Sequence, residues 1–238
     1  MIVVADDLGS GPGTDDAILE LFGGVVDAAS LLVNGVGFDE AIEHARPLPG
    51  QLGVHLCLTD GEPLTDAMRG ASRFCDDDGQ FRLWRGAERA FHLGSHERGL
   101  VAAEFRAQIE RARRAGVRIA HLDSHHHVHT EPAIAPIVIR LAREIGVPRV
   151  RLARNCGSGL GPANRAWKTV FNLYLRRRGL AGTKWFGRVE DYEYLTSRRG
   201  AVDSFELMVH PTRNEAGVVE DPERPGVELA LTLSALRA

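Results

Sequence analysis

The sequence has few of the residues that build disulfide-linked, membrane-spanning or nucleic-acid-binding proteins. Its 238 residues include only 3 cysteines, too few and too scattered for a disulfide framework or a cysteine-rich zinc module. Lys and Arg total 29 against 32 for Asp and Glu, so the chain lacks the basic excess of a nucleic-acid binder. No apolar run approaches the roughly 18 residues of a membrane span. We therefore expect a soluble protein of a reducing compartment, with no nucleic-acid partner.

The amino terminus also lacks the features of an export signal. It reads Met-Ile-Val-Val-Ala-Asp-Asp, with an acidic pair where a secretory signal has a longer apolar stretch after a basic start. This favours a cytoplasmic location. Hydrophobic residues make up 44% and charged residues 26%, a globular mix, and the length fits one domain over residues 1–238.

Short apolar runs alternate with helical patterns along the chain. The apolar runs predict buried strands at residues 2–5, 28–33, 52–58, 117–123, 149–152 and 205–209. Helices are predicted from Thr14 to Gly23 and at residues 38–46, 97–115, 133–145 and 227–236. This alternation is typical of βαβ units and a mainly parallel sheet. The region 155–200 is basic and irregular, and we expect it to be partly helical.

Polar side chains fall in or just after the predicted strands. They are Asp6, Asp7, Asn34, His55, the run from Asp123 to His129, Arg151, Arg154 and His210. In parallel α/β folds the site is built from the carboxyl ends of the strands and the loops after them. We therefore expect these side chains to converge on one rim.

Asp6 and Asp7 follow directly on a buried strand. Two adjacent carboxylates there are costly unless a cation or hydrogen-bond donors balance them. Adjacent strand residues point to opposite faces, so one carboxylate could bind a metal while the other accepts a proton. The alternative is that one of them caps the glycine-rich loop at 9–13.

The strongest local signal is the histidine run from His121 to His129. In an extended chain the odd-numbered residues of this run share one face. Imidazole and carboxylate are common ligands of zinc and related divalent ions. The alternatives are an exposed histidine-rich loop or an adventitious nickel or copper site. Not every histidine of the run can bind one ion, so some must orient ligands or contact substrate.

His55 and His210 are weaker signals. A lone histidine in an apolar strand is more often a core residue bonded to the backbone than a ligand. Asp76 to Asp78 resembles a solvated turn rather than a calcium loop, because ligands at alternating positions and a closing Glu are missing.

Five blocks of sequence resemble the YdjC-like carbohydrate deacetylases. The blocks are residues 3–9, 30–35, 53–64, 121–129 and 206–211, and the likeness runs in order over residues 2–152 before it resumes at 206. That family includes chitooligosaccharide deacetylases and hopanoid-biosynthesis-associated deacetylases. The resemblance implies a TIM-barrel-like (β/α) barrel that removes N-acetyl groups from amino sugars with one divalent metal ion. The weak match over 155–200 leaves substrate specificity open.

The resemblance also implies roles for individual residues. Asp7, His55 and His125 look like the metal ligands, and Asp6 resembles the catalytic base. His210, or a histidine of the 126–129 run, could give a proton to the leaving amine. Substrate contact or support of the ligands is expected of a further set: Asn34, Asp123, His127, His129 and Arg151. None of His121, His126, His127 and His129 is expected to bind the main ion.

Several alternatives stay open at this stage. Two histidines and one aspartate favour zinc by ligand softness, while the family resemblance favours magnesium. A two-metal phosphoesterase on a barrel scaffold is a rival activity, and a non-catalytic metal-binding protein is a third reading. Relatives usually continue into a further strand after the terminal helix. We therefore expect an incomplete barrel whose edge is open or covered by a second subunit of a homodimer.

Overall fold

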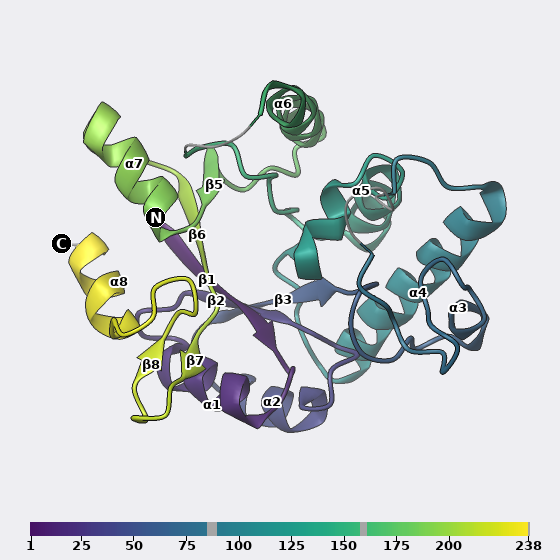
Figure 1. Cartoon of the computed structure of the whole chain (residues 1–238), viewed down its shortest axis with the longest axis horizontal. Coiled ribbons are helices and arrows are strands. Elements are labelled where there is room, and N and C mark those ends of the chain that lie inside the picture. The colour runs from purple at the N-terminus through teal and green to yellow at the C-terminus, as the bar shows by residue number, and fades with distance from the viewer. Residues whose placement is uncertain (85–89, 158–160, 238) are drawn as a thin grey trace.

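Six parallel strands form the centre of the molecule (Figure 1). The computed structural model describes residues 1–84, 90–157 and 161–237. The sheet order is β4-β3-β2-β1-β6-β5. All five strand pairings are parallel. The strands are β1 (Ile2–Leu8), β2 (Ala28–Leu31), β3 (Gln51–Leu56), β4 (Leu122–Ser124), β5 (Trp185–Gly187) and β6 (Phe205–Val209).

Helices cover the outside of the sheet (Figure 1). They are α1 (Pro12–Leu21), α2 (Phe38–Ala45), α3 (Asp66–Arg69), α4 (Ser95–Arg114), α5 (Ala135–Ile145), α6 (Pro162–Arg177), α7 (Val189–Arg199) and α8 (Leu229–Arg237). A short 3-10 helix, η2 (His125–Thr130), follows β4, and β7 (Thr212–Arg213) pairs with β8 (Val219–Glu220) as an antiparallel hairpin.

The sheet curls, and an irregular segment spans its two edges. Val150 makes isolated parallel bridges to Leu122 in β4 and to Ala181, which lies just before β5. The N–H of Arg151 donates to the carbonyl oxygen of Leu122 at 3.0 Å. The fold is thus an incomplete α/β barrel, as predicted from the sequence. The predicted strand at 149–152 is wrong in one respect, since this segment forms only single bridges.

Two other predicted elements are shorter than expected. The strand predicted at 117–123 is a ladder only over β4, and Gly116, with a left-handed φ of +82°, separates α4 from the residues that lead into it. There the N–H of Ala120 donates to the carbonyl oxygen of Leu52. The first helix begins at Pro12 rather than after Thr14, because proline is well suited to the first helical position. The region 155–200 contains α6, β5 and α7, so the expectation of partial helix is confirmed over its described residues.

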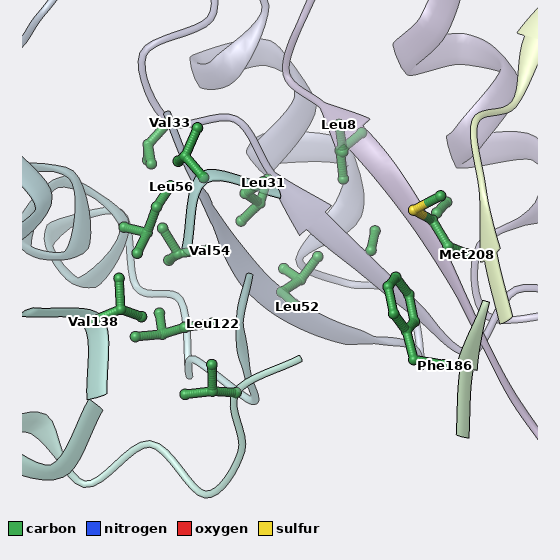
Figure 2. Packing of buried hydrophobic residues seen from close by; sticks show 14 of the residues in the cluster. Leu8, Leu31, Val33, Leu52, Val54, Leu56, Leu122, Val138, Phe186 and Met208 are labelled. Carbon is green, nitrogen blue, oxygen red and sulfur yellow. The ribbon is translucent and has the colours of Figure 1, made fainter. Parts of the chain in front are cut away.

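Successive side chains of β3 point alternately into the apolar core and toward the polar residues of the site. Val54 and Leu56 are fully buried among Leu31, Leu122 and other apolar side chains (Figure 2). Successive strand residues point to opposite faces, so His55 between them points the other way. Burial of such apolar side chains contributes about 1.5–3 kcal/mol each and anchors the strand ends that carry the polar residues.

Within the described residues, no helix has both the length and the apolar character needed to cross a bilayer.

Candidate functional site

A cavity of about 690 Å³ lies at the carboxyl ends of the strands. Its wall includes residues that lie in or just after β1, β3, β4 and β6. Among them are Asp6, Asp7, His55, His125, His127 and His210. The parallel sheet brings these strand ends to one rim, which is where α/β folds build their sites.

Three of these side chains form a tight cluster on the cavity wall. His125 Nδ1 lies 2.7 Å from Asp7 Oδ1, and His55 Nε2 lies 3.3 Å from the same oxygen. Asp7 has a left-handed φ of +70°, so the chain turns sharply just where its carboxylate meets the two imidazoles. Such a backbone conformation in a non-glycine residue is uncommon and concentrates at functional sites.

The cluster fits a divalent metal ion. One carboxylate and two imidazole nitrogens offer ligand atoms that all lie within 4.8 Å of one another. His55 Nδ1 lies 2.8 Å from Asp123 Oδ1, which indicates that Nδ1–H donates to that carboxylate and that Nε2 is free to act as a ligand. A carboxylate behind a histidine is the usual way in which proteins orient a metal-binding imidazole. Asp7, His55 and His125 could therefore hold such an ion together.

Charge within the cluster is balanced by the histidines. Burial raises the pKa of Asp7, but the hydrogen bonds from His125 and His55 outweigh it and hold that pKa well below its usual range. Burial lowers the pKa of His55, but Asp123 and Asp6 outweigh it and hold that pKa well above its usual value. Without a metal the His55 imidazole thus carries a proton beside the carboxylates. A divalent ion bound there would displace that proton.

A second acidic group lies behind the cluster, around the buried side chain of Arg151. Arg151 Nη1 and Nη2 donate to the two oxygens of Asp6 at 2.6 and 2.8 Å. Nη1 also lies 2.8 Å from Asp123 Oδ2, and Nε donates to Glu206 Oε1 at 2.6 Å. One guanidinium thus joins three buried carboxylates, a planar geometry that lysine could not reproduce.

The contacts of Arg151 affect the pKa values of two buried carboxylates, Asp123 and Glu206. Burial raises the pKa of Asp123, but Arg151 and His55 hold it well below its usual range. Burial also raises the pKa of Glu206, with Arg151 opposing the shift. Arg151 lies on the irregular segment that bridges β4 and the residues just before β5. The position of this segment places the guanidinium beside the carboxylates.

The histidine run does not adopt the extended form that the sequence analysis assumed. Residues His125 to Thr130 form η2, with left-handed φ values of 51° at His126 and 57° at His127. The expectation that alternate residues of the run share one face is therefore wrong. Because the chain turns after β4, the imidazoles of the run point in different directions.

The remaining histidines of the run have separate partners. His121 Nε2 lies 3.0 Å from Ser30 Oγ, and His126 Nδ1 lies 3.0 Å from Thr59 Oγ1. His129 Nδ1 lies 2.6 Å from Ser124 Oγ, while its Nε2 lies 3.2 Å from the carbonyl oxygen of Arg151. The described structure gives His127 Nδ1 no hydrogen-bond partner, although this buried atom belongs to a residue of the cavity wall.

Three predicted residues lie apart from the cluster. Asn34 is not on the wall of the main cavity: its amide donates to the carbonyl oxygens of Asp60 and Glu62 and holds that turn. Arg154 is on the wall, but its guanidinium is paired with Asp191. His210 lies on the cavity wall, and its backbone N–H donates to Asp221 Oδ2.

Sequence reasoning assigned no specific role to three residues that support the site. Glu206 binds Arg151, Ser30 donates to Asp123 Oδ2 at 2.7 Å, and Ser124 contacts His129. Their signal is that Ser30 and Glu206 are polar residues of predicted strands and that Ser124 belongs to the histidine-rich run. A buried polar residue needs a partner, so each such position could have been marked as part of a network.

Fold and site together define an α/β-barrel protein with a candidate metal centre at the carboxyl ends of its strands. The chain belongs to the YdjC-like family, since the family model described as YdjC-like protein matches residues 1–235.

Curated relatives match about three fifths of the chain. A carbohydrate deacetylase of Brevibacillus brevis is 42% identical over 150 residues, which is 62% of this chain and 57% of the relative. A carbohydrate deacetylase of Oceanobacillus iheyensis is 33% identical over 146 residues, 60% of this chain and 61% of the relative. The matches thus span less than two thirds of these relatives' length.

A solved structure supports the fold over the whole chain. A protein of Enterococcus faecalis, described as a candidate cellobiose-phosphate cleavage protein, superposes with a TM-score of 0.71 at 23% sequence identity. The superposition covers 100% of this chain and 90% of that one, so the incomplete barrel is shared.

Proposed function

We propose that this protein is a metal-dependent hydrolase that removes the acetyl group from an N-acetylated amino sugar or oligosaccharide. The observation that carries the proposal is the Asp7–His55–His125 cluster on a cavity wall, with the Asp6 carboxylate on the same wall. Relatives named carbohydrate deacetylase support the substrate class.

The proposed chemistry is amide hydrolysis. A divalent ion, when bound, would polarise the acetamide carbonyl and lower the pKa of a water molecule. Asp6 accepts a proton from that water as the water oxygen attacks the carbonyl carbon. The C–N bond then breaks, and His210 gives a proton to the leaving amine. The products are acetate and the free amino sugar.

Arg151 sets the direction of the Asp6 carboxylate in this proposal. Both carboxylate oxygens receive hydrogen bonds from the guanidinium, so Asp6 cannot rotate away from the cavity. Asp123 does the same for His55 by accepting from Nδ1. His129 supports the Arg151 backbone, which extends this ordering to the irregular segment of the barrel.

The rival activity is a two-metal phosphoesterase. It has one observation in its favour, a second group of possible ligands formed by Asp6, His55 and Asp123 within 4.8 Å of one another. Arg151 already binds both of those carboxylates, so a cation occupies the place of the second metal. The geometry therefore favours one ion in each chain, bound at Asp7.

Metal content and acetate release test the proposal together. Protein loaded with Zn²⁺ or Mg²⁺ should hold one ion in each chain and release acetate from a panel of N-acetylated glucosamine monomers and oligomers. Two ions in each chain, with phosphate release from sugar phosphates and no acetate release, would favour the phosphoesterase instead. Chelation should abolish the acetate release, and the metal that restores it identifies the natural ion.

A further inference from the structure

The outer face of α6 is an apolar surface that the described structure leaves uncovered. Val170, Leu173 and Tyr174 are 57%, 43% and 38% exposed. They follow Ala163 and Ala166 at spacings of three and four residues, so they form one stripe along the helix. The helix lies at the edge of the molecule (Figure 1).

The inner face of the same helix is firmly attached to the barrel. Phe171 and Leu175 are buried, and the Asn172 side chain exchanges two hydrogen bonds with the backbone of Ala153. Trp167 Nε1 donates to the carbonyl oxygen of Thr130 at 2.8 Å. The exposed stripe is therefore a fixed feature of the fold, and not a helix that could turn its apolar side inward.

Charge within the segment that contains α6 has a single sign. Residues 155–189 contain no Asp or Glu, and their charged residues are Arg165, Lys168, Arg176, Arg177, Arg178, Lys184 and Arg188. Lys184 and Arg188, beyond the end of α6, are paired with Asp203 and Glu223. This is a strong local excess in a chain whose net charge is −3. Arg165 and Arg177 are exposed and form no ion pair within the residues that the structure describes. Arg178 lies over the ring of Tyr174, 5.0 Å from its centroid.

We propose that α6 docks the protein on an anionic lipid surface. A helix that presents aliphatic and aromatic residues between arginines suits the interface of a membrane, where the apolar stripe enters the headgroup region and the cations meet anionic lipids. Tyrosine favours the same zone because its ring is apolar and its hydroxyl is polar.

Two other partners fit the same surface less well. A two-fold contact between two copies of α6 would bring one basic face against another, which is repulsive. Nucleic acid would satisfy the arginines but would gain little from Val170 and Leu173. Of these three partners, a lipid surface alone uses both the charge and the aliphatic side chains.

Docking through α6 would place the cavity beside the lipid. Asn164 and Lys168, both on α6, line the cavity wall. The helix therefore forms part of the cavity on one side and the exposed stripe on the other. The inference goes beyond the proposed activity and does not depend on it, because vesicle binding needs neither metal nor substrate.

Vesicle co-sedimentation of the purified full chain tests the proposal. The wild type should bind phosphatidylcholine vesicles that contain phosphatidylglycerol, bind pure phosphatidylcholine weakly, and be released by added salt. The double variant Arg165→Gln/Arg177→Gln should weaken partition by about fivefold for each arginine removed. Val170→Gln/Leu173→Gln should weaken it by about tenfold or more, since both side chains leave the apolar phase.

Matched controls keep the test decisive. Arg114→Gln/Arg118→Gln removes the same charge from exposed positions elsewhere, and Leu231→Gln removes an aliphatic side chain that is 65% exposed on α8. These variants should bind vesicles like the wild type, and circular dichroism should show all variants folded. Equal binding by the α6 variants and the wild type would overturn the proposal. So would self-association abolished by Val170→Gln/Leu173→Gln without vesicle binding, or binding to a DNA oligonucleotide that needs the arginines alone.

Discussion

Two groups of acidic side chains lie next to each other at the carboxyl ends of the strands, and they differ in how their charge is balanced. Asp7 faces the cavity with two imidazoles and is partly exposed. Asp6, Asp123 and Glu206 are buried around a permanent cation, the guanidinium of Arg151. Ligand spacing alone does not separate the two groups, because Asp6 and Asp123 together with His55 also offer three ligand atoms within 4.8 Å of one another.

The difference shows what a fixed cation does to a carboxylate cluster. Arg151 keeps a permanent positive charge among Asp6, Asp123 and Glu206, so a cation already lies within that group without a metal ion. Around Asp7 the positive charge is only a proton on an imidazole, and a divalent ion can replace it. The open cluster is therefore the candidate metal centre, and the buried cluster is its support.

The largest expected effect comes from removing a ligand of the open cluster. His55→Ala or His125→Ala should abolish bound metal and acetate release together, because two remaining ligands hold a divalent ion poorly. Elemental analysis after gel filtration measures the metal, and His96→Ala, which changes an exposed histidine on α4, is the control. Full metal occupancy in both variants would refute the ligand assignment.

The next test divides the adjacent aspartates between the two clusters. Asp7→Asn should lose metal affinity, since a neutral amide is a weak ligand. Asp6→Asn should keep the metal and lose about 10²–10⁴-fold in turnover, the usual contribution of a general base. Metal content and acetate release of both variants, measured beside His210→Ala, decide the matter. If Asp6→Asn keeps most of its activity, or His210→Ala alone shows the large loss, Asp6 is not the base.

The two clusters also show how far the sequence can predict this structure. The strand ends that carry Asp7, His55 and His125 could be predicted, because apolar runs mark the strands and parallel strands share one rim. Arg151 could be assigned to the same rim, but its three carboxylate partners could not be predicted, since they depend on where an irregular segment crosses between the sheet edges. The turn at His126 and His127 could not be predicted either, because a left-handed backbone at two successive non-glycine residues is uncommon.

A smaller effect is expected in the pH dependence of the free energy of unfolding, which depends on buried histidines and on Asp123. Burial lowers the pKa of His121 and of His129 to about 3 each. In the unfolded chain these residues take up protons near pH 6.5, so the free energy of unfolding should fall as the pH falls from 6.5 toward 3. Each histidine contributes at most about 1.4 kcal/mol per pH unit across that window. Asp123, whose pKa is held low by Arg151 and His55 against the effect of burial, should steepen the loss below pH 4.

Urea unfolding between pH 7 and pH 5 measures this slope. His121→Gln keeps a polar side chain near Ser30 but removes the titrating group, so its unfolding free energy should depend less on pH than that of the wild type. His96→Gln on the surface should leave the slope unchanged. A slope in His121→Gln equal to that of the wild type would show that the acid sensitivity arises elsewhere.

The smallest expected effect is at Glu206, where the buried cluster carries more negative charge than Arg151 can neutralise. Burial raises the pKa of Glu206 although Arg151 opposes it, so the neutral acid is favoured more than in water. Gln has the shape of that neutral acid, and its oxygen can still accept from Arg151 Nε. Glu206→Gln should therefore keep its metal and most of its turnover. Glu206→Ala should instead leave Nε without an acceptor, cost about 1–3 kcal/mol of stability, and lower kcat without changing KM as Arg151 holds Asp6 less firmly. If Glu206→Gln is as damaging as Glu206→Ala, the negative charge of Glu206 is needed. Glu206 would then not be a neutral acid beside Arg151.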